Sequence, residues 1–117
     1  MAVQDFKLLQ KVQDMMIYGY PILNRFPKAE KFSLAQDIRH CMNEILSLTV
    51  TEEKRYSKRT TLEYLDVENE KLKIYLRVAM QLKYISPHTY GVWEEKLVEI
   101  GKMIGGLMKS VINRPKT

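Results

Sequence analysis

Cysteine and long apolar runs are both scarce in this sequence. Cys41 is the single cysteine among 117 residues, which excludes an internal disulfide and the pattern of a disulfide-rich secreted domain. No stretch approaches the roughly 18 consecutive apolar residues that a membrane-spanning helix needs. Residues 1–7 also lack the apolar run of a signal peptide. We therefore expect a cytoplasmic protein.

The chain is also poor in residues that assemble metal centres and active sites. Its two histidines, His40 and His88, lie far apart in the sequence, and no Glu-x-x-His pair of the di-iron type is present. His40 directly precedes Cys41, and adjacent side chains diverge on a helix, so a surface imidazole beside a core thiol is the simpler interpretation. Gly101 and Gly105 lie inside an apolar helical pattern, which excludes a phosphate loop and predicts a thin place where a neighbouring helix packs closely. The sequence predicts no metal site, no cofactor and no catalytic residue.

Large apolar residues, in contrast, are abundant and recur at helical spacing. Hydrophobic residues make up 45% of the chain, with only five glycines and four prolines. Toward the C-terminus, steps of three and four residues keep one stripe on one face of an α-helix, which a strand cannot do. This stripe consists of Tyr90, Trp93, Leu97, Ile100, Ile104, Leu107 and Val111. Ser86 as N-cap and Pro87 as first helical residue mark the start of the helix, and Pro115 ends it near Asn113.

A first helix is predicted over residues 5–24, with two apolar stripes side by side. One stripe comprises Phe6, Leu9, Met16, Tyr20 and Leu23. The other comprises Leu8, Val12, Met15, Gly19 and Ile22. So wide an apolar face exceeds what an outer helix of a monomeric bundle needs, and we expect it to take part in self-association. Pro21 predicts a kink or an early end, and residues 25–28 are expected to form a connector.

Two further helices are predicted in the middle of the chain. Ser33 is expected to cap the second, with Gln36 completing a capping box. The apolar stripe of this helix is Leu34, Ile38, Cys41, Ile45 and Leu48. The periodicity is lost at residues 56–60, which predicts a turn, and Thr60 or Thr61 is expected to cap the third helix. The stripe of that helix is Leu62, Leu65, Leu72, Leu76 and Ala79, with Asn69 at its one polar position.

Four helices of similar length joined by short connections favour one architecture. Short connections place consecutive helices side by side and antiparallel. We therefore predict an all-α chain in which residues 1–117 form a single domain, an up-down-up-down antiparallel four-helix bundle. Burial of the four stripes is its main source of stability.

Antiparallel packing gathers the positive charge of the chain at the two ends of the bundle. The net charge is +5 and the pI about 9.3. The N-terminus, the turn between the second and third helices, and the C-terminus meet at one end, here called the turn end. It collects Lys7, Lys11, Lys54, Arg55, Lys58, Arg59, Lys109, Arg114 and Lys116, against Asp5, Glu52, Glu53 and Glu63. The opposite end, here called the connector end, holds Arg25, Lys28, Lys31 and Lys83 against Glu30.

The middle of the bundle holds the remaining six Lys and Arg against nine Asp and Glu, for a charge of −3. Basic ends on either side of an acidic middle are expected of a protein that contacts phosphate at its ends. A simpler explanation is equally compatible with the composition, because solvated helix termini often carry Lys and Arg. The sequence contains no helix-turn-helix or zinc-finger motif, so any nucleic-acid binding is predicted to be largely independent of base sequence.

Four segments of the chain resemble known four-helix-bundle proteins. Residues 26–39 are similar to the junction before the second helix in proteins encoded by ribosomal-RNA intervening sequences. Residues 75–79, 82–90 and 99–107 resemble the related accessory variability determinants (Avd) of diversity-generating retroelements. The likeness covers about residues 5–112. Residues 43–48 depart from the Ser-Ile-Pro-type segment typical of the ribosomal-RNA branch, which favours the retroelement branch.

The resemblance implies a homopentameric barrel of four-helix bundles. It also implies a non-enzymatic accessory role, in which basic surfaces bind the reverse transcriptase of the retroelement and nucleic acid, either RNA or DNA. Such proteins support adenine-directed mutagenic copying of a template RNA. Arg39 and Arg77 fall within the matching segments and are the functional residues that the resemblance implies. The alternative is a structural bundle of the intervening-sequence type that binds only protein.

Charge and resemblance together define the residues expected to bind nucleic acid or the reverse transcriptase. They are Arg39, Lys54, Arg55, Lys58, Arg59, Arg77, Lys109 and Arg114. Four of them, at positions 54, 55, 58 and 59, lie within six consecutive residues.

Overall fold

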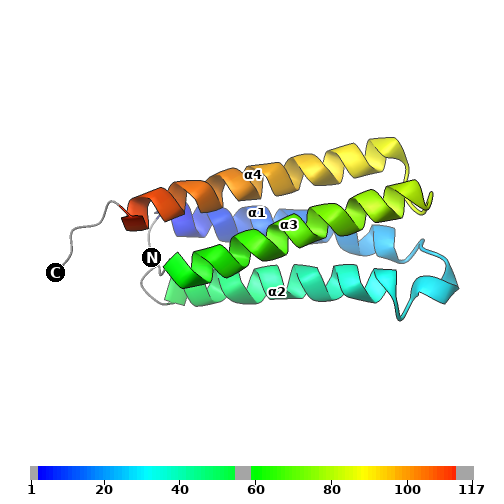
Figure 1. Cartoon of the computed structure of the whole chain (residues 1–117), viewed down its shortest axis with the longest axis horizontal. Coiled ribbons are helices and arrows are strands. Elements are labelled where there is room, and N and C mark those ends of the chain that lie inside the picture. Colours follow the sequence, from blue (N-terminus) through cyan, green and yellow to red (C-terminus); the bar gives the residue numbers. More distant parts are fainter. Residues whose placement is uncertain (1–2, 55–58, 113–117) are drawn as a thin grey trace.

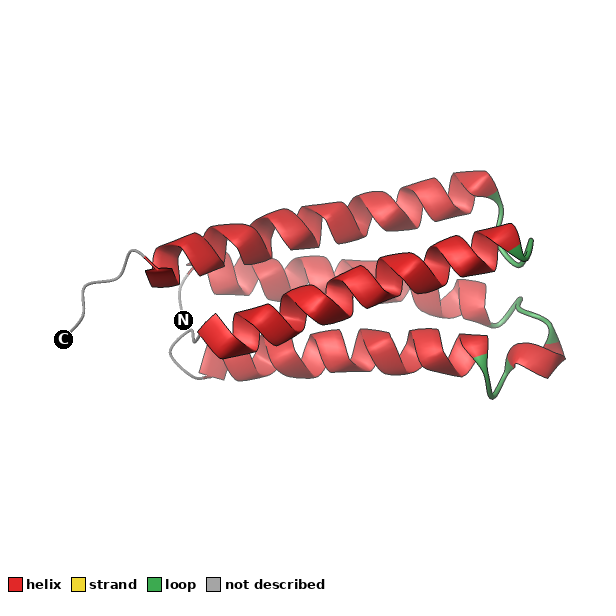
Figure 2. Ribbon diagram, viewed as in Figure 1, coloured by secondary structure: helices red, strands yellow, loops and turns green. Residues whose placement is uncertain are grey.

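The computed structural model describes residues 3–54 and 59–112, with side chains described for 7–54 and 59–111. Four α-helices account for nearly all of these residues: α1 (Val3–Leu23), α2 (Leu34–Lys54), α3 (Arg59–Gln81) and α4 (Pro87–Ile112). A short 3₁₀ turn, η1 (Lys28–Glu30), lies in the connection between α1 and α2. Figures 1 and 2 show the helices running alternately up and down, with no strand in the described part of the chain. The predicted all-α antiparallel four-helix bundle is confirmed.

The helix boundaries follow the sequence closely where a capping residue is present. The Thr89 backbone N–H donates to Ser86 Oγ over 3.1 Å, and α4 begins at Pro87. Ser33 directly precedes α2, and its carbonyl accepts the Asp37 N–H over 2.8 Å. Pro21 lies inside α1, which ends two residues later, so the early end that Pro21 suggested does not occur.

The third helix begins earlier than predicted. Arg59 is already helical, so the expectation that Thr60 or Thr61 caps α3 is wrong. The physical reason is that Arg59 lies one helical turn from Glu63, and their side chains form an ion pair of 3.0 Å that favours this turn. The rest of the predicted turn, residues 56–58, and the predicted helix end at Asn113 lie outside the described residues.

The apolar stripes form one continuous core between the helices. Each helix packs against two neighbours: α1 and α3 both contact α2 and α4. On α4 the stripe residues Trp93, Leu97, Ile100 and Ile104 are fully buried. Asn69, the polar position among the buried residues of α3, is also buried, and its Nδ2 donates to the Leu97 carbonyl oxygen over 2.9 Å.

Glycine allows a close approach at one position that the sequence analysis did not single out. A Cβ atom at Gly19 of α1 would overlap Trp93 Cζ2 and lie 2.9 Å from Trp93 Cη2. At Gly101 a Cβ would lie 3.4 Å from Asn69 Nδ2, an ordinary contact, and at Gly105 it would meet nothing within 4 Å. The expected close packing is therefore not found at either glycine: a Cβ at Gly101 would make an ordinary contact, and Gly105 faces open space.

This contrast predicts opposite effects of the same substitution at two helical glycines. Gly19→Ala should destabilise the protein by about 1–3 kcal/mol, because the added methyl group overpacks the core against Trp93. Gly105→Ala should stabilise it by about 0.8–1.0 kcal/mol, because alanine favours the helix and the site has room. Urea unfolding of both variants measures the two changes. A Gly19→Ala protein as stable as the wild type would contradict the packing described here.

Candidate nucleic-acid interface

The candidate residues divide between the two ends of the bundle. The C-terminus of α2, the N-terminus of α3 and the C-terminus of α4 lie together at the turn end (Figure 1). Exposed there are Lys54, Arg59 and Lys109. Three further candidates, Arg55, Lys58 and Arg114, lie outside the described residues.

Ion pairs within the chain reduce the positive charge that the turn end offers to a partner. Lys11 Nζ lies 2.9 Å from Glu99 Oε2, and Arg59 Nε lies 3.0 Å from Glu63 Oε1. The hydrogen bond between Lys11 and Glu99 raises the pKa of the lysine and lowers the pKa of the glutamate. Both pairs are exposed, so they contribute little to stability. Lys54 and Lys109 form no ion pair with a described carboxylate and are available to a partner.

The two residues implied by the family resemblance lie toward the other end. Arg39 is half-buried near the start of α2, and Arg77 is exposed near the end of α3. Because α2 and α3 are antiparallel neighbours, both positions lie toward the connector end. Neither arginine forms an ion pair with a carboxylate of the described chain. The structure therefore divides the candidate residues between two basic regions, one at each end of the bundle. The sequence analysis had listed them as a single set.

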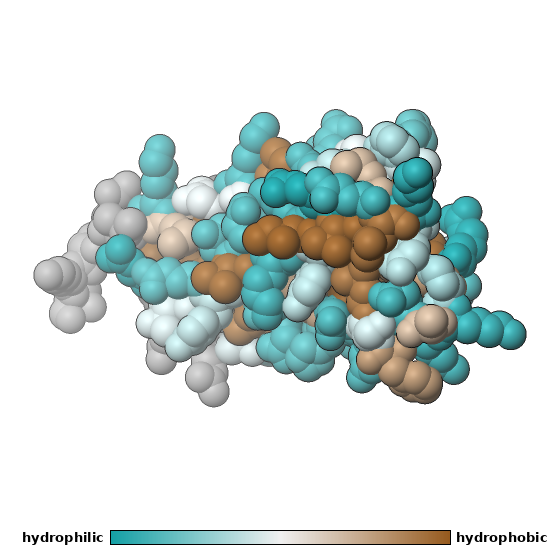
Figure 3. Space-filling view, turned by 45° about the vertical axis from the view of Figure 1, so that its right-hand side comes forward, coloured by the Kyte–Doolittle hydropathy of each residue, from teal (hydrophilic) through white to brown (hydrophobic). Residues whose placement is uncertain are grey.

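An exposed apolar stripe follows the outer face of α3. Its members recur at steps of three, four and seven residues, and between 41% and 61% of each side chain is exposed. This set, here called the α3 stripe, is Tyr64, Val67, Ile74 and Val78, followed by Leu82 just beyond the helix. Figure 3 shows brown, hydrophobic surface gathered in a band along one face of the molecule. The sequence analysis did not identify this stripe, although the steps of three, seven and four residues between Tyr64, Val67, Ile74 and Val78 carry the signal.

The bare apolar face expected on α1 is wrong. One of its two stripes, from Leu8 to Ile22, is buried in the core, and Met16 and Tyr20 of the other stripe pack against the core. The physical reason is that α1 contacts both α2 and α4, so a wide apolar face is used within the subunit. Among the described residues of α1, only Ile17 is a large apolar side chain with high exposure, at 73%.

The described residues contain no group of three or more His, Cys, Asp or Glu side chains placed to hold a metal ion. None of the described helices is long and apolar enough to cross a membrane.

His40 is exposed while Cys41 is buried, as the sequence suggested. The Cys41 thiol donates to the Glu68 carbonyl oxygen over 3.2 Å, and burial raises its pKa to about 12.

The pKa of Cys41 predicts an unreactive thiol in the native protein. Because the thiolate is the nucleophile, a pKa of about 12 in place of 9.0 lowers the thiolate population near pH 8 roughly a thousandfold. Native protein should therefore resist iodoacetamide at this pH, while protein unfolded in urea reacts at the ordinary rate. Mass spectrometry of both reactions over time measures the difference. Equal rates would mean that Cys41 is not held in the core.

One comparison with known proteins gives a match. The model of a family described as bAvd-like matches residues 6–111, which include all but the ends of the described helices. Against individually curated proteins, the chain has no significant match.

Proposed function

The chain belongs to the bAvd-like family, and we propose that it is a non-enzymatic accessory subunit of a diversity-generating retroelement. In this role it binds the reverse transcriptase of the element together with nucleic acid, and it supports mutagenic reverse transcription of a template RNA. The observation that carries the proposal is the family match over residues 6–111. The unpaired cations at both ends of the bundle support the nucleic-acid part of it.

Binding to nucleic acid would depend on phosphate and not on base sequence. Lys54 and Lys109 are exposed and unpaired at the turn end, where Lys and Arg can neutralise phosphates and release counterions. The described elements are long helices joined by short connections, and none forms a helix-turn-helix that could enter the major groove. Affinity would therefore fall steeply with salt and change little with sequence.

Self-association is the second part of the proposal. Soluble proteins seldom leave a long apolar stripe uncovered, and the α3 stripe is the most extended exposed apolar feature of the described surface. We assign it to contacts between copies of the chain in a homopentamer. A ring would repeat each basic region around one axis. The electrostatic fields of the subunits would then add, so that the ring attracts phosphate more strongly than a single subunit does. A bundle that binds only protein remains the second candidate, and the apolar α3 stripe is the observation in its favour.

The turn-end candidates can be tested by reversing their charge. We expect the triple variant Lys54→Glu, Arg59→Glu, Lys109→Glu, in which all three side chains are exposed, to weaken RNA and DNA binding similarly for all sequences. The slope of log K against log salt should flatten by about 0.9 per lost contact on duplex. Electrophoretic mobility shifts over a salt series measure both effects, and assembly should remain intact because exposed charges contribute little to stability.

A matched control reverses three lysines in the middle of the bundle, Lys71, Lys73 and Lys96. Two of these, Lys71 and Lys73, already pair with Glu68 and Glu70, so the control should affect binding less than the turn-end variant. Unchanged binding by the turn-end variant would move the site to the connector end. Absence of binding by the wild type would favour the protein-only bundle.

The assembly surface can be tested on α3 and α1 separately. Ile74→Asp with Val78→Asp should convert the oligomer to monomer without unfolding it, because both side chains are exposed in the subunit, at 53% and 41%. Ile17→Asp on α1 is the control and should leave the oligomer intact. Sedimentation velocity reports the mass of each protein, and five subunits are expected for the wild type. A wild type that is monomeric at micromolar concentration would overturn the assignment.

A further inference from the structure

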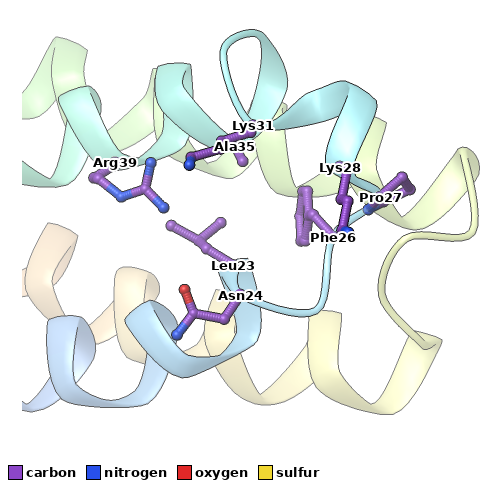
Figure 4. A pocket seen from close by; sticks show the side chains of 8 residues that line it. All are labelled: Leu23, Asn24, Phe26, Pro27, Lys28, Lys31, Ala35 and Arg39. Atoms are coloured by element: carbon purple, nitrogen blue, oxygen red, sulfur yellow. The ribbon is translucent and has the colours of Figure 1, made fainter.

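A small cavity lies at the connector end, between the end of α1 and the start of α2. Its volume is about 220 Å³, and eight side chains line it (Figure 4). They are Leu23, Asn24, Phe26, Pro27, Lys28, Lys31, Ala35 and Arg39, here called the connector pocket. The lining combines apolar and cationic side chains.

The apolar wall of the connector pocket is held in place by the core. Leu23, Phe26 and Ala35 are each more than nine-tenths buried. The Phe26 ring packs against the ring of Tyr84 with centroids 5.5 Å apart, and the Phe26 N–H donates to the Leu23 carbonyl oxygen over 3.2 Å. Because the wall belongs to the core, the cavity exists before any ligand arrives.

Three cations surround this wall. Lys28 begins the η1 turn and Lys31 follows it, and the Lys31 N–H donates to the Lys28 carbonyl oxygen over 3.1 Å. The Lys28 side chain runs toward Phe26 (Figure 4). Arg39 approaches from the first turns of α2, and Figure 4 shows the ends of Lys31 and Arg39 turned toward one another. None of the three cations pairs with a described carboxylate.

The ends of Lys31 and Arg39 face one another, and neither pairs with a described carboxylate, so the two cations attract an anion. A planar guanidinium suits the bidentate recognition of phosphate, and lysine adds a point charge that reorients easily. The apolar wall formed by Leu23, Phe26 and Ala35 gives a second requirement, since inorganic phosphate alone would leave it unused. The ligand class that satisfies both is a phosphate joined to a flat ring whose faces can pack on apolar side chains.

The size of the pocket limits the ligand to one such unit. A volume of about 220 Å³ is below the range of about 300–1,000 Å³ that is typical of drug-sized ligands. A base within a duplex is stacked and cannot enter a cavity, whereas an unstacked base in a single strand can. We propose that the connector pocket binds one nucleotide of a single-stranded nucleic acid, with its phosphate on Lys31 and Arg39 and its base against Leu23 and Phe26. This inference rests on the nucleic-acid binding proposed above.

The charges of the connector pocket are tested by removing them in the full-length protein. Lys31→Gln with Arg39→Gln should weaken binding of a fluorescent single-stranded oligonucleotide about tenfold for each lost contact. The salt slope should decrease by about 0.7 per contact, the single-strand value. The same oligonucleotide in a duplex should bind almost as it does to the wild type. Lys71→Gln with Lys73→Gln is the control of equal charge change, and it should affect both ligands only slightly.

The cavity itself is tested by filling it without changing any charge. Ala35→Leu should lower single-strand affinity about as much as the double variant and leave duplex affinity unchanged. Because Ala35 is buried, a thermal melt of Ala35→Leu is needed to show that this variant still folds. If it does not fold, the double variant Lys31→Gln with Arg39→Gln decides the question, because it changes one exposed and one half-buried side chain.

The outcomes separate this inference from the proposed function. If the double variant binds the single strand as tightly as the wild type does, the connector pocket is not the nucleotide site. The proposed function would be unaffected by that result. A wild type that binds neither single strand nor duplex would overturn the proposed function. Adenosine monophosphate is the competitor that distinguishes a free nucleotide from a strand. If it displaces the oligonucleotide at equal concentration, the pocket is a mononucleotide site and the strand assignment is wrong.

Discussion

The fit of Trp93 against Gly19 is the contact on which the connector end depends. The indole is fully buried and occupies the space where α1 has no side chain, so it sets how closely α1 and α4 approach. Its Nε1 has no hydrogen-bond partner among the described residues, and the contact therefore rests on packing. The Tyr18 ring meets the indole edge-on, with ring centroids 6.1 Å apart. From Gly19, α1 continues to Leu23, which lines the connector pocket.

A second constraint aligns α3 with α4. Asn69 is buried, and its Nδ2 reaches across to the Leu97 carbonyl oxygen over 2.9 Å, beside Gly101. A single buried polar contact of this kind stabilises a bundle less than an apolar pair does, but it favours one register over its neighbours. Register matters for function here because it determines where Arg77 on α3 lies relative to the connector end.

The surface of the protein carries three separate features: two basic ends and the α3 stripe along the length between them. Lys54 and Lys109 remain unpaired at the turn end, although Arg59 and Lys11 are neutralised by carboxylates of the same chain. At the connector end Arg39 has no such partner and faces a cavity. A bundle that exposes charge at its ends and apolar side chains along its flank can assemble side by side and keep its ends accessible.

The helices, the Ser86 cap and the buried stripe on α4 were determined by the sequence itself, because helical periodicity and capping involve residues a few positions apart. The residues that contact across the bundle were decided only by the tertiary structure. A 3.6-residue period shows which faces of a helix are apolar, but it does not show which of these faces a neighbouring helix covers. The sequence therefore predicted an uncovered apolar face on α1, whereas the structure has it on α3. It named Arg39 through a family resemblance, yet the pocket that Arg39 shares with Lys31 depends on how the η1 turn packs on α2. Such contacts are set by side-chain fit between distant segments, and no local pattern of residues contains that information.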